Sequence, residues 1–263
     1  MAINKRRIAI IFFIIACLPF FAHAAAYKDL SSTTPYYLQN AEVSLGVGPT
    51  FYRVNKGHIV VTLIENDTAA PNSVFTTVAY RIGAGYYLFK SHFTPDSFFN
   101  SLLAELSLYH SNFTIKGQVL QSGQQDLINY NFKVPYSSTA LMLDFKPGFL
   151  AYKKLSPYAI FGLGVAWNQI SYKETLATPD VPANSIIALA SRTKQNFAYD
   201  LGLGARYAFT KHISTSVEYI YTHLGNVIPS TTSSSSASNV SILIPPTFTV
   251  YNQTLFFNVI YNF

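Results

Sequence analysis

The sequence predicts an all-β chain that folds as an eight-stranded antiparallel up-and-down β-barrel crossing a membrane. Large apolar residues alternate with smaller or polar ones in repeated segments of about ten residues, the length of a tilted membrane-spanning strand. Aromatic residues make up 16% of the chain, whereas charged residues make up only 11%. A segment typical of export stands at the N-terminus, and no run of about 18 apolar residues follows it. Only helices and closed barrels satisfy every backbone group in lipid, so these observations favour the barrel.

The first 24 residues are predicted to be a secretory signal peptide. Basic residues at 5–7 precede an apolar run at 8–21, which is too short to cross a bilayer comfortably. Ala-His-Ala at 22–24 has the small residues of a signal-peptidase site. A retained membrane anchor and a lipoprotein modification of Cys17 are the alternatives. The mature chain is therefore expected to be one barrel domain, residues 25–263, without cysteine and without disulfides.

The charge of the mature chain argues against a nucleic-acid partner. Three of the 18 Lys and Arg residues lie in the leader, and the remainder nearly balances the 12 Asp and Glu residues. The sequence has no dense basic patch of the kind that neutralises a phosphate backbone. Its histidines are scattered without metal-ligand spacing, so neither a metal nor another cofactor is expected.

The first four predicted strands place apolar side chains on one face and mostly glycine, polar or charged side chains on the other. Their outward-facing residues are Val43, Leu45, Val47 and Phe51 (about 42–51); Val78, Tyr80, Ile82, Ala84 and Tyr86 (about 74–86); Leu102, Ala104, Leu106 and Leu108 (about 100–110); and Leu141, Leu143 and Phe145 (about 137–146). Side chains on a strand alternate with period two, so each segment shows an oily face to the membrane.

The last four predicted strands follow the same rule. Their outward-facing residues are Ala159, Phe161, Leu163, Val165 and Trp167 (about 158–168); Phe197, Tyr199, Leu201, Leu203 and Tyr207 (about 196–208); Ile213, Val217, Tyr219 and Tyr221 (about 213–222); and Leu255, Phe257, Val259, Tyr261 and Phe263 (about 249–263). The final strand alternates most clearly, so we expect it to close the barrel. The alternative is the last strand of a soluble β-sandwich.

The connections between these strands alternate in length. Those after the second, fourth and sixth strands are short, and the four long ones lie at about 52–73, 111–136, 169–195 and 223–248. Short periplasmic turns and long external loops are typical of bacterial outer-membrane barrels. Both termini are therefore expected on the periplasmic side.

Three features of the sequence bear on the length, regularity and number of the strands. Residues 113–116 and 128–132 are apolar enough to continue their strands as a hairpin above the membrane. The apolar parity changes near Pro135, which predicts a β-bulge there. The apolar stretch 58–64 is a candidate for a further short strand, so a ten-stranded barrel is the alternative.

The pattern of the whole mature chain resembles the small outer-membrane β-barrel superfamily, which includes the OmpA transmembrane domain, OmpX, OmpW and the opacity-type surface antigens. Residues 206–221 (R-Y-A-F-T-K-H-I-S-T-S-V-E-Y-I-Y) are similar to the hairpin of the sixth and seventh strands in that group. The apolar alternation at 255–263 resembles the C-terminal signature that the barrel-assembly machinery reads. The resemblance implies an integral protein of the bacterial outer membrane, in contact with outer-membrane lipid, lipopolysaccharide and that machinery.

The charged residues of the predicted strands share the polar parity, so they are expected to face the barrel interior. They are Glu42, Arg81, Glu105, Asp144, Lys146, Asp200, Arg206 and Glu218. An eight-stranded barrel is barely wide enough for its own side chains, and an unpaired buried charge is costly. An interior ion-pair network is therefore predicted, with Arg81 beside Glu105 and Arg206 beside Glu218. A gated path for water or ions is the alternative.

The sequence argues against two enzymatic functions. The His-Ser-Asn sequence at 110–112 is only loosely similar to the His and Ser of outer-membrane lipid A deacylases, because adjacent residues on a strand face opposite sides. A protease of the omptin type would need paired Asp-Asp and Asp-His sites. The loop residues Asp67, Asp126, Asp180 and His223 form no such motif.

The sequence therefore predicts a non-enzymatic outer-membrane protein, either surface antigen-like or adhesin-like, or envelope-stabilising. Its external loops would contact a host or another extracellular ligand. The alternative is an OmpW-like passage for small hydrophobic molecules, suggested by apolar loop bases at 59–61 and 242–245. A lipid-modifying enzyme is the second alternative.

Overall fold

The computed structural model describes residues 40–60, 66–71, 75–90, 99–120, 130–149, 154–177, 186–231 and 245–263. Within them lie the strands β1 (Ala41–Val54), β2 (Gly57–Val60), β3 (Asn66–Pro71), β4 (Phe75–Lys90), β5 (Phe99–Leu120), β6 (Tyr130–Phe149), β7 (Leu155–Leu176), β8 (Ala188–Ala208), β9 (Ile213–Val227) and β10 (Phe248–Asn262). In this part of the chain, no helix is long and apolar enough to cross a membrane.

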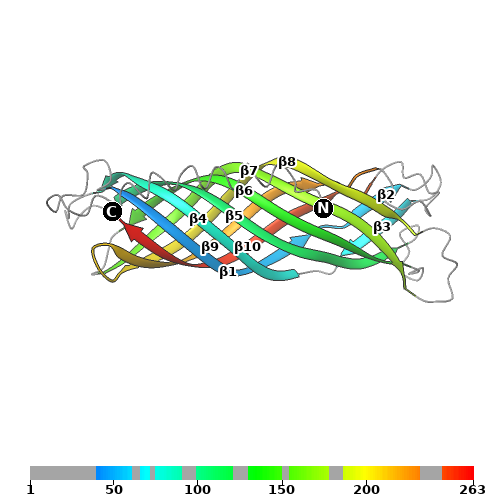
Figure 1. The fold of residues 1–263 in the computed structure, drawn as a ribbon, viewed down its shortest axis with the longest axis horizontal. Helices are drawn as coiled ribbons and strands as arrows, with labels where there is room; N and C mark the ends of the chain where they lie inside the picture. Colours follow the sequence, from blue (N-terminus) through cyan, green and yellow to red (C-terminus); the bar gives the residue numbers. More distant parts are fainter. Residues whose placement is uncertain are drawn as a thin grey trace, which may run out of the picture. The chain divides into compact units, whose positions relative to one another are not determined.

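Eight of the strands form a closed antiparallel ring. The order around it is β5, β4, β1, β10, β9, β8, β7 and β6, and β6 pairs again with β5 (Figure 1). The predicted eight-stranded barrel is therefore confirmed. β1 and β10 pair from Glu42 opposite Asn262 to Val54 opposite Val250, so the first and last strands of the ring close it without an open edge.

The strands β2 and β3 lie outside this ring. They pair with each other, and β3 pairs with the far end of β5, where Thr68 is opposite Leu120. The sheet thus has ten strands, of which eight close the barrel. β2 takes up the start of the stretch 58–64 that predicted an additional strand, whereas residues 61–65 lie outside the described residues.

The ring strands run farther than the sequence predicts. β5 continues to Leu120 and β6 begins at Tyr130, so the hairpin expected above the third and fourth strands is present. β7 continues to Leu176 and β8 begins at Ala188. Much of the two predicted loops between these strand pairs is therefore strand.

The predicted bulge near Pro135 is wrong. The pairing of β5 with β6 runs from Ser101 to Val119 without a shift, and the even-numbered residues of β6 stay inside throughout. The inner face changes from polar to apolar instead. From Ala140 toward the start of β6, the inward side chains include the buried apolar residues Val134 and Phe132. The apolar residues move from the outer to the inner face where the strands pass from lipid into water.

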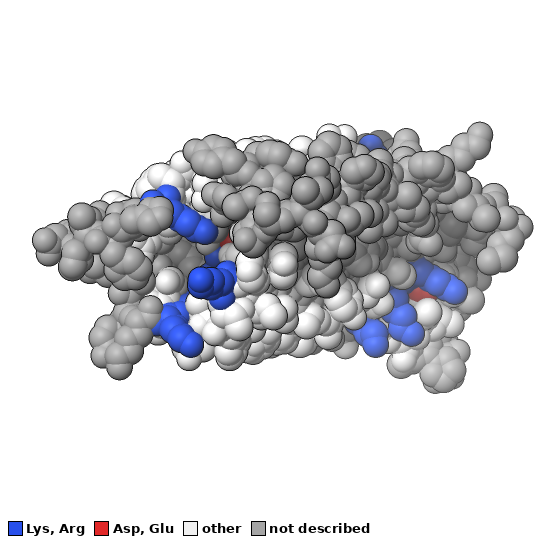
Figure 2. Space-filling model, turned by 60° about the vertical axis from the view of Figure 1, so that its left-hand side comes forward, with Lys and Arg blue, Asp and Glu red and all other residues white. Residues whose placement is uncertain are grey.

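This inversion divides the barrel into two tiers. In the membrane tier, below the level of Phe51 and Trp167, outer side chains are large and apolar, and Leu163 and Leu203 are 59% and 67% exposed. In the outer tier, above that level, the outer face is polar and residues such as Ile170 are buried, as in a soluble protein. Among the side chains coloured in Figure 2, Lys and Arg gather toward the two ends, with uncharged surface between them.

Candidate functional site

The membrane tier holds a cluster of charged side chains around Arg81. The guanidinium lies 3.1 Å from Glu105 and 2.8 Å from Glu218, and it also contacts Asp144. These four residues come from β4, β5, β9 and β6, so the cluster crosses the barrel interior. None is more than 5% exposed, and buried charges of this kind need their partners in place.

Lys146 of β6 completes this cluster. Its amine lies 3.0 Å from Glu105 and 2.9 Å from Glu218. The hydroxyl of Tyr158 donates a further hydrogen bond of 2.7 Å to Glu218. Glu218 thereby links β4, β6 and β7 to its own strand, β9.

A second ion pair lies nearer to the turn between β8 and β9. Arg206 donates two hydrogen bonds of 2.7 Å to Glu42 of β1, and another to the hydroxyl of Tyr87. The sequence predicted Glu218 as the partner of Arg206, and that pairing is wrong. The register places Ser216, and not Glu218, opposite Arg206. Glu218 is the next inward-facing residue along β9.

Asp200 of β8 makes no ion pair in the part of the chain that the structure describes. Its Oδ1 and the Oδ1 of Asp144 have no hydrogen-bond partner among these residues. A Cβ at Gly162 would collide with both oxygens, so the two carboxylates converge on the space that the glycine leaves. The cluster therefore contains more acids than cations. The cations are Arg81 and Lys146, and the acids are Glu105, Asp144, Asp200 and Glu218.

A polar and aromatic layer separates the charge cluster from the outer tier. The hydroxyls of Tyr52 and Tyr109 lie 2.8 Å apart, and Asn252 donates a hydrogen bond of 2.7 Å to Tyr109. Phe113 stacks on Tyr52 with ring centroids 4.0 Å apart, and its centroid lies 4.9 Å from that of Tyr136. Tyr52, Phe113 and Tyr136 fall within the connections predicted at 52–73 and 111–136. These three residues do continue the alternation of inward-facing positions along their strands. The alternation could therefore have predicted that their side chains lie inside the barrel.

The outer tier buries the carboxylate of Glu174 on β7, which is 2% exposed. It accepts hydrogen bonds of 2.7 Å from the Tyr172 hydroxyl and 3.1 Å from the Ile187 N–H. Burial raises the pKa of Glu174 to about 7, and the nearby charge of Asp67 on β3 acts in the same direction, while the two hydrogen bonds oppose it. The protonation of Glu174 therefore changes near neutral pH.

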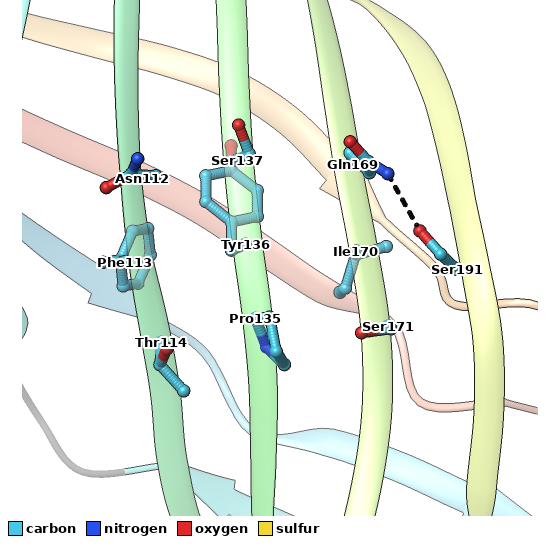
Figure 3. Close-up of a pocket in the computed structure, with 10 residues that line it drawn as sticks. All are labelled: Asn112, Phe113, Thr114, Pro135, Tyr136, Ser137, Gln169, Ile170, Ser171 and Ser191. Carbon is cyan, nitrogen blue, oxygen red and sulfur yellow. Dashed lines mark hydrogen bonds between the residues drawn. The ribbon is translucent and has the colours of Figure 1, made fainter. Parts of the chain in front are cut away.

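A groove of about 350 Å³ opens on the outer wall of the outer tier. Its lining residues are Asn112, Phe113, Thr114, Pro135, Tyr136, Ser137, Gln169, Ile170, Ser171 and Ser191 (Figure 3). Pro135 has no N–H, and the pairing of β6 with β7 is interrupted beside it. The register of β7 against β8 shifts at Ser171. Two interruptions of the ladder thus meet at this groove.

The residues of the predicted C-terminal signal line the outer face at the closing strand. They are Leu255, Phe257, Val259, Tyr261 and Phe263. Phe257 and Val259 are 51% and 60% exposed, and the N–H of Phe263 donates a hydrogen bond of 3.1 Å to the carbonyl of Ala41. The last residues therefore take part directly in joining β10 to β1.

Comparison with known proteins agrees with this architecture. The model of the family described as outer membrane protein beta-barrel domain matches residues 13–263. This chain belongs to that family. Membership supports an outer-membrane location, in which the apolar face of the membrane tier meets lipid and the surroundings include lipopolysaccharide.

Individual relatives of this family member are distant. The outer membrane protein PagN of Salmonella typhimurium is 29% identical over 121 residues, which cover 43% of this chain and 48% of PagN. The chain thus spans about half the length of this curated relative. The outer membrane protease OmpT of Escherichia coli has a TM-score of 0.52 at 10% identity, covering 88% of this chain and 99% of OmpT. The outer membrane protein OprG of Pseudomonas aeruginosa has a TM-score of 0.46 at 15% identity, covering 86% and 98%.

At these identities the solved structures show the fold alone, and proteins of this fold include a protease. The lipase candidates of this family member lie on opposite sides of β5. Ser111 is fully buried and contacts the hydroxyl of Tyr52 inside the barrel. His110 lies on the outer face, where its Nδ1 is 3.0 Å from the Thr139 hydroxyl.

The protease candidates are also spread over the barrel. His223 of β9 lies on the outer face, and its ring stacks on Tyr199 with centroids 4.9 Å apart. Asp67 is buried on β3, whereas Asp126 and Asp180 lie outside the described residues. Among the residues that are described, no group of three or more His, Cys, Asp and Glu could hold a metal ion.

Proposed function

We propose that this family member is a non-enzymatic surface protein, antigen-like, adhesin-like or envelope-stabilising, which acts through its outer tier and external connections. The observation that carries the proposal is that side chains fill the barrel interior along its length. Arg81 and its partners fill the membrane tier, and Tyr109 and Asn252 lie in the layer above them. Apolar residues such as Ile115 and Leu224 fill the outer tier, and each of these named side chains is at most 5% exposed. A filled eight-stranded barrel leaves little space for cargo, whereas its rigid upper strands present surface for binding.

Conductance tests the filled interior. Purified protein in a planar bilayer should give no steady large current, because open aqueous channels need about 16 strands. Small, rare openings are compatible with rearranging ion pairs. A reproducible open channel that discriminates ions by charge would contradict the proposal.

Attachment tests the role of the external connections. Replacing residues 120–129 by Asn-Gly, so that the two-residue turn joins Val119 of β5 to its partner Tyr130 of β6, should reduce binding of barrel-expressing bacteria to host cells or matrix. The ring strands should remain folded and heat-modifiable, because Asn-Gly suits a two-residue hairpin turn. If this variant and equivalent replacements of 178–185 and 232–244 all leave attachment unchanged, the connections are not the interaction sites.

A second candidate function is an OmpW-like sideways passage for small hydrophobic molecules. The groove favours it, because two ladder interruptions meet there and Phe113 and Tyr136 contribute to its lining. A disulfide between Pro135→Cys and Ser171→Cys would hold β6 against β7. This candidate predicts slower uptake of a medium-chain fatty acid by the oxidised variant and recovery on reduction. Equal uptake in both states would count against it.

A further inference from the structure

Three lysines stand side by side on the outer face of the outer tier. Lys116 of β5 is directly opposite Lys133 of β6, and Lys133 is directly opposite Lys173 of β7. All three are exposed, and they share the outward parity of their strands. We call this set the lysine row.

The lysine row is electrostatically unfavourable on its own. Opposite residues in an antiparallel sheet have Cβ atoms about 4.5–5.5 Å apart, and like charges at such positions weaken the pairing. Within the described ranges, no carboxylate forms an ion pair with any of the three amines. The adjacent acid Glu174 points inward, where it accepts the hydrogen bond from Tyr172. The row therefore offers its positive charge to an anion from outside the chain.

The groove beside the row adds neutral hydrogen-bonding groups. The hydroxyls of Thr114, Ser137 and Ser171 line it, and Gln169 donates a hydrogen bond of 3.1 Å to Ser191 (Figure 3). Lysine amines bind phosphate as point charges through charge-assisted hydrogen bonds. Amines beside hydroxyl and amide groups suit a ligand that carries both phosphate and sugar hydroxyls.

The height of the lysine row above the membrane indicates which ligand of this kind lies beside it. Thr139 of β6 is opposite Trp167, at the edge of the membrane tier, and Lys133 lies six residues beyond Thr139. At about 3.4 Å per residue and a strand tilt of about 40°, the row stands roughly 15 Å beyond that edge. In an outer leaflet made of lipopolysaccharide, the phosphorylated saccharide occupies this height, and the acyl chains lie below it.

We propose that the lysine row and the groove bind the phosphorylated saccharide of lipopolysaccharide in the same membrane. The three amines contact phosphate, and the groove receives the adjoining sugar. This inference goes beyond the proposed function, because it assigns a lipid ligand to the barrel wall itself and not to the external connections.

The test compares two variants of the full barrel in detergent. The lysine-row variant changes Lys116, Lys133 and Lys173 to Gln. The matched control removes the same charge from exposed positions elsewhere, with Gln at Arg53, Lys56 and Lys211. Each protein is titrated with lipopolysaccharide and with the same lipopolysaccharide after removal of its phosphates.

The lysine-row variant should bind phosphorylated lipopolysaccharide at least tenfold more weakly than the parent protein, and the control should stay within twofold. The dephosphorylated lipid should bind the parent protein as weakly as phosphorylated lipid binds the variant. Equal affinity of the parent protein and the lysine-row variant would overturn the proposal. Binding of soluble sulfated glycans through the row, without binding of phosphorylated lipopolysaccharide, would also overturn it.

Urea unfolding without lipid separates binding from folding. The lysine-row variant should be at least as stable as the parent protein, because the substitutions remove like-charge repulsion. A clearly lower unfolding midpoint would contradict the electrostatic argument on which the proposal rests.

Discussion

Arg81 donates a hydrogen bond of 2.8 Å to Glu218 across the barrel interior. The two residues belong to β4 and β9, which are separated in the ring by β1 and β10. Their contact therefore fixes the cross-section of the membrane tier and does not merely join neighbouring strands. Because Glu105 and Asp144 contact the same guanidinium, one cation neutralises parts of three buried acids.

Replacing Arg81 by Leu should destabilise the barrel by about 3–5 kcal/mol, because it leaves buried carboxylates without their partner. Adding Glu105→Leu should recover only part of this loss, since Asp144 and Glu218 remain. Urea unfolding in detergent measures both variants. Full recovery in the double variant would mean that Arg81 and Glu105 form an isolated pair.

The pair of Arg206 and Glu42 offers a contrast, because Glu42 is the only acid with which Arg206 forms an ion pair among the described residues. Arg206→Leu leaves a carboxylate that is 1% exposed. The double variant with Glu42→Leu removes both charges, so it should be more stable than the single variant by at least about 1 kcal/mol. If the single variant is the more stable of the two, Glu42 has another cationic partner after the substitution.

Asp200→Asn should stabilise the barrel at neutral pH by about 1–2 kcal/mol, because it removes a negative charge from a buried cluster that has too many. Asp144→Asn is the matched control. It should destabilise, because the Asp144 carboxylate contacts Arg81 and accepts a hydrogen bond of 2.8 Å from Ser107. Unfolding midpoints that shift in the same direction for both variants would contradict this charge balance.

Glu174 should make the stability of the outer tier depend on pH. The folded state raises its pKa from 4.5 to about 7. Between these values the unfolded chain has released the proton that the folded chain keeps, so the free energy of unfolding falls as pH rises and levels off above about pH 7. Glu174→Gln should remove this fall and be more stable than the parent protein at pH 8, by on the order of 2 kcal/mol. Urea midpoints from pH 4.5 to 8 check this, and a pH-independent difference between the two proteins would contradict it.

Deleting Phe263 should reduce the yield of folded, heat-modifiable barrel. The deletion removes the hydrogen bond from Phe263 to Ala41 at the seam of β1 and β10, together with the last aromatic residue of the predicted assembly signal. Phe263→Tyr keeps both features and is the control. Membrane integration of the deletion variant at the normal level would show that neither feature is required.

The alternation of side chains predicts most of the ring, because lipid imposes a strict outer face on every strand of the membrane tier. It also places residues such as Arg81 and Asp200 inside the barrel. It cannot give the partner of Arg206, because parity fixes the side of the sheet and not the level at which a long side chain ends. Glu42 lies on a strand that is distant in the chain and is reached only through the closed interior.

The outer tier could not be predicted by the same rule. There the strands stand in water, so Phe132 and Val134 face inward while Lys133 faces out. The bulge was predicted because the apolar residues were assumed to face lipid along the whole strand. β3 has the sequence N-D-T-A-A-P, which has low strand propensity and ends in proline. Its pairing with the extension of β5 is a tertiary contact that no local pattern in the sequence records.

The seam between β1 and β10 also governs when the barrel can form. Residues from nearly opposite ends of the described chain, such as Glu42 and Asn262, must meet in register. Closing so long a loop carries an entropic cost before any contact rewards it, and contacts so distant in sequence slow folding. Until the last strand arrives, the growing sheet keeps two unpaired edges that can pair with other chains. The topology therefore makes closure a late, cooperative event, and the unclosed chain is the species most prone to aggregate.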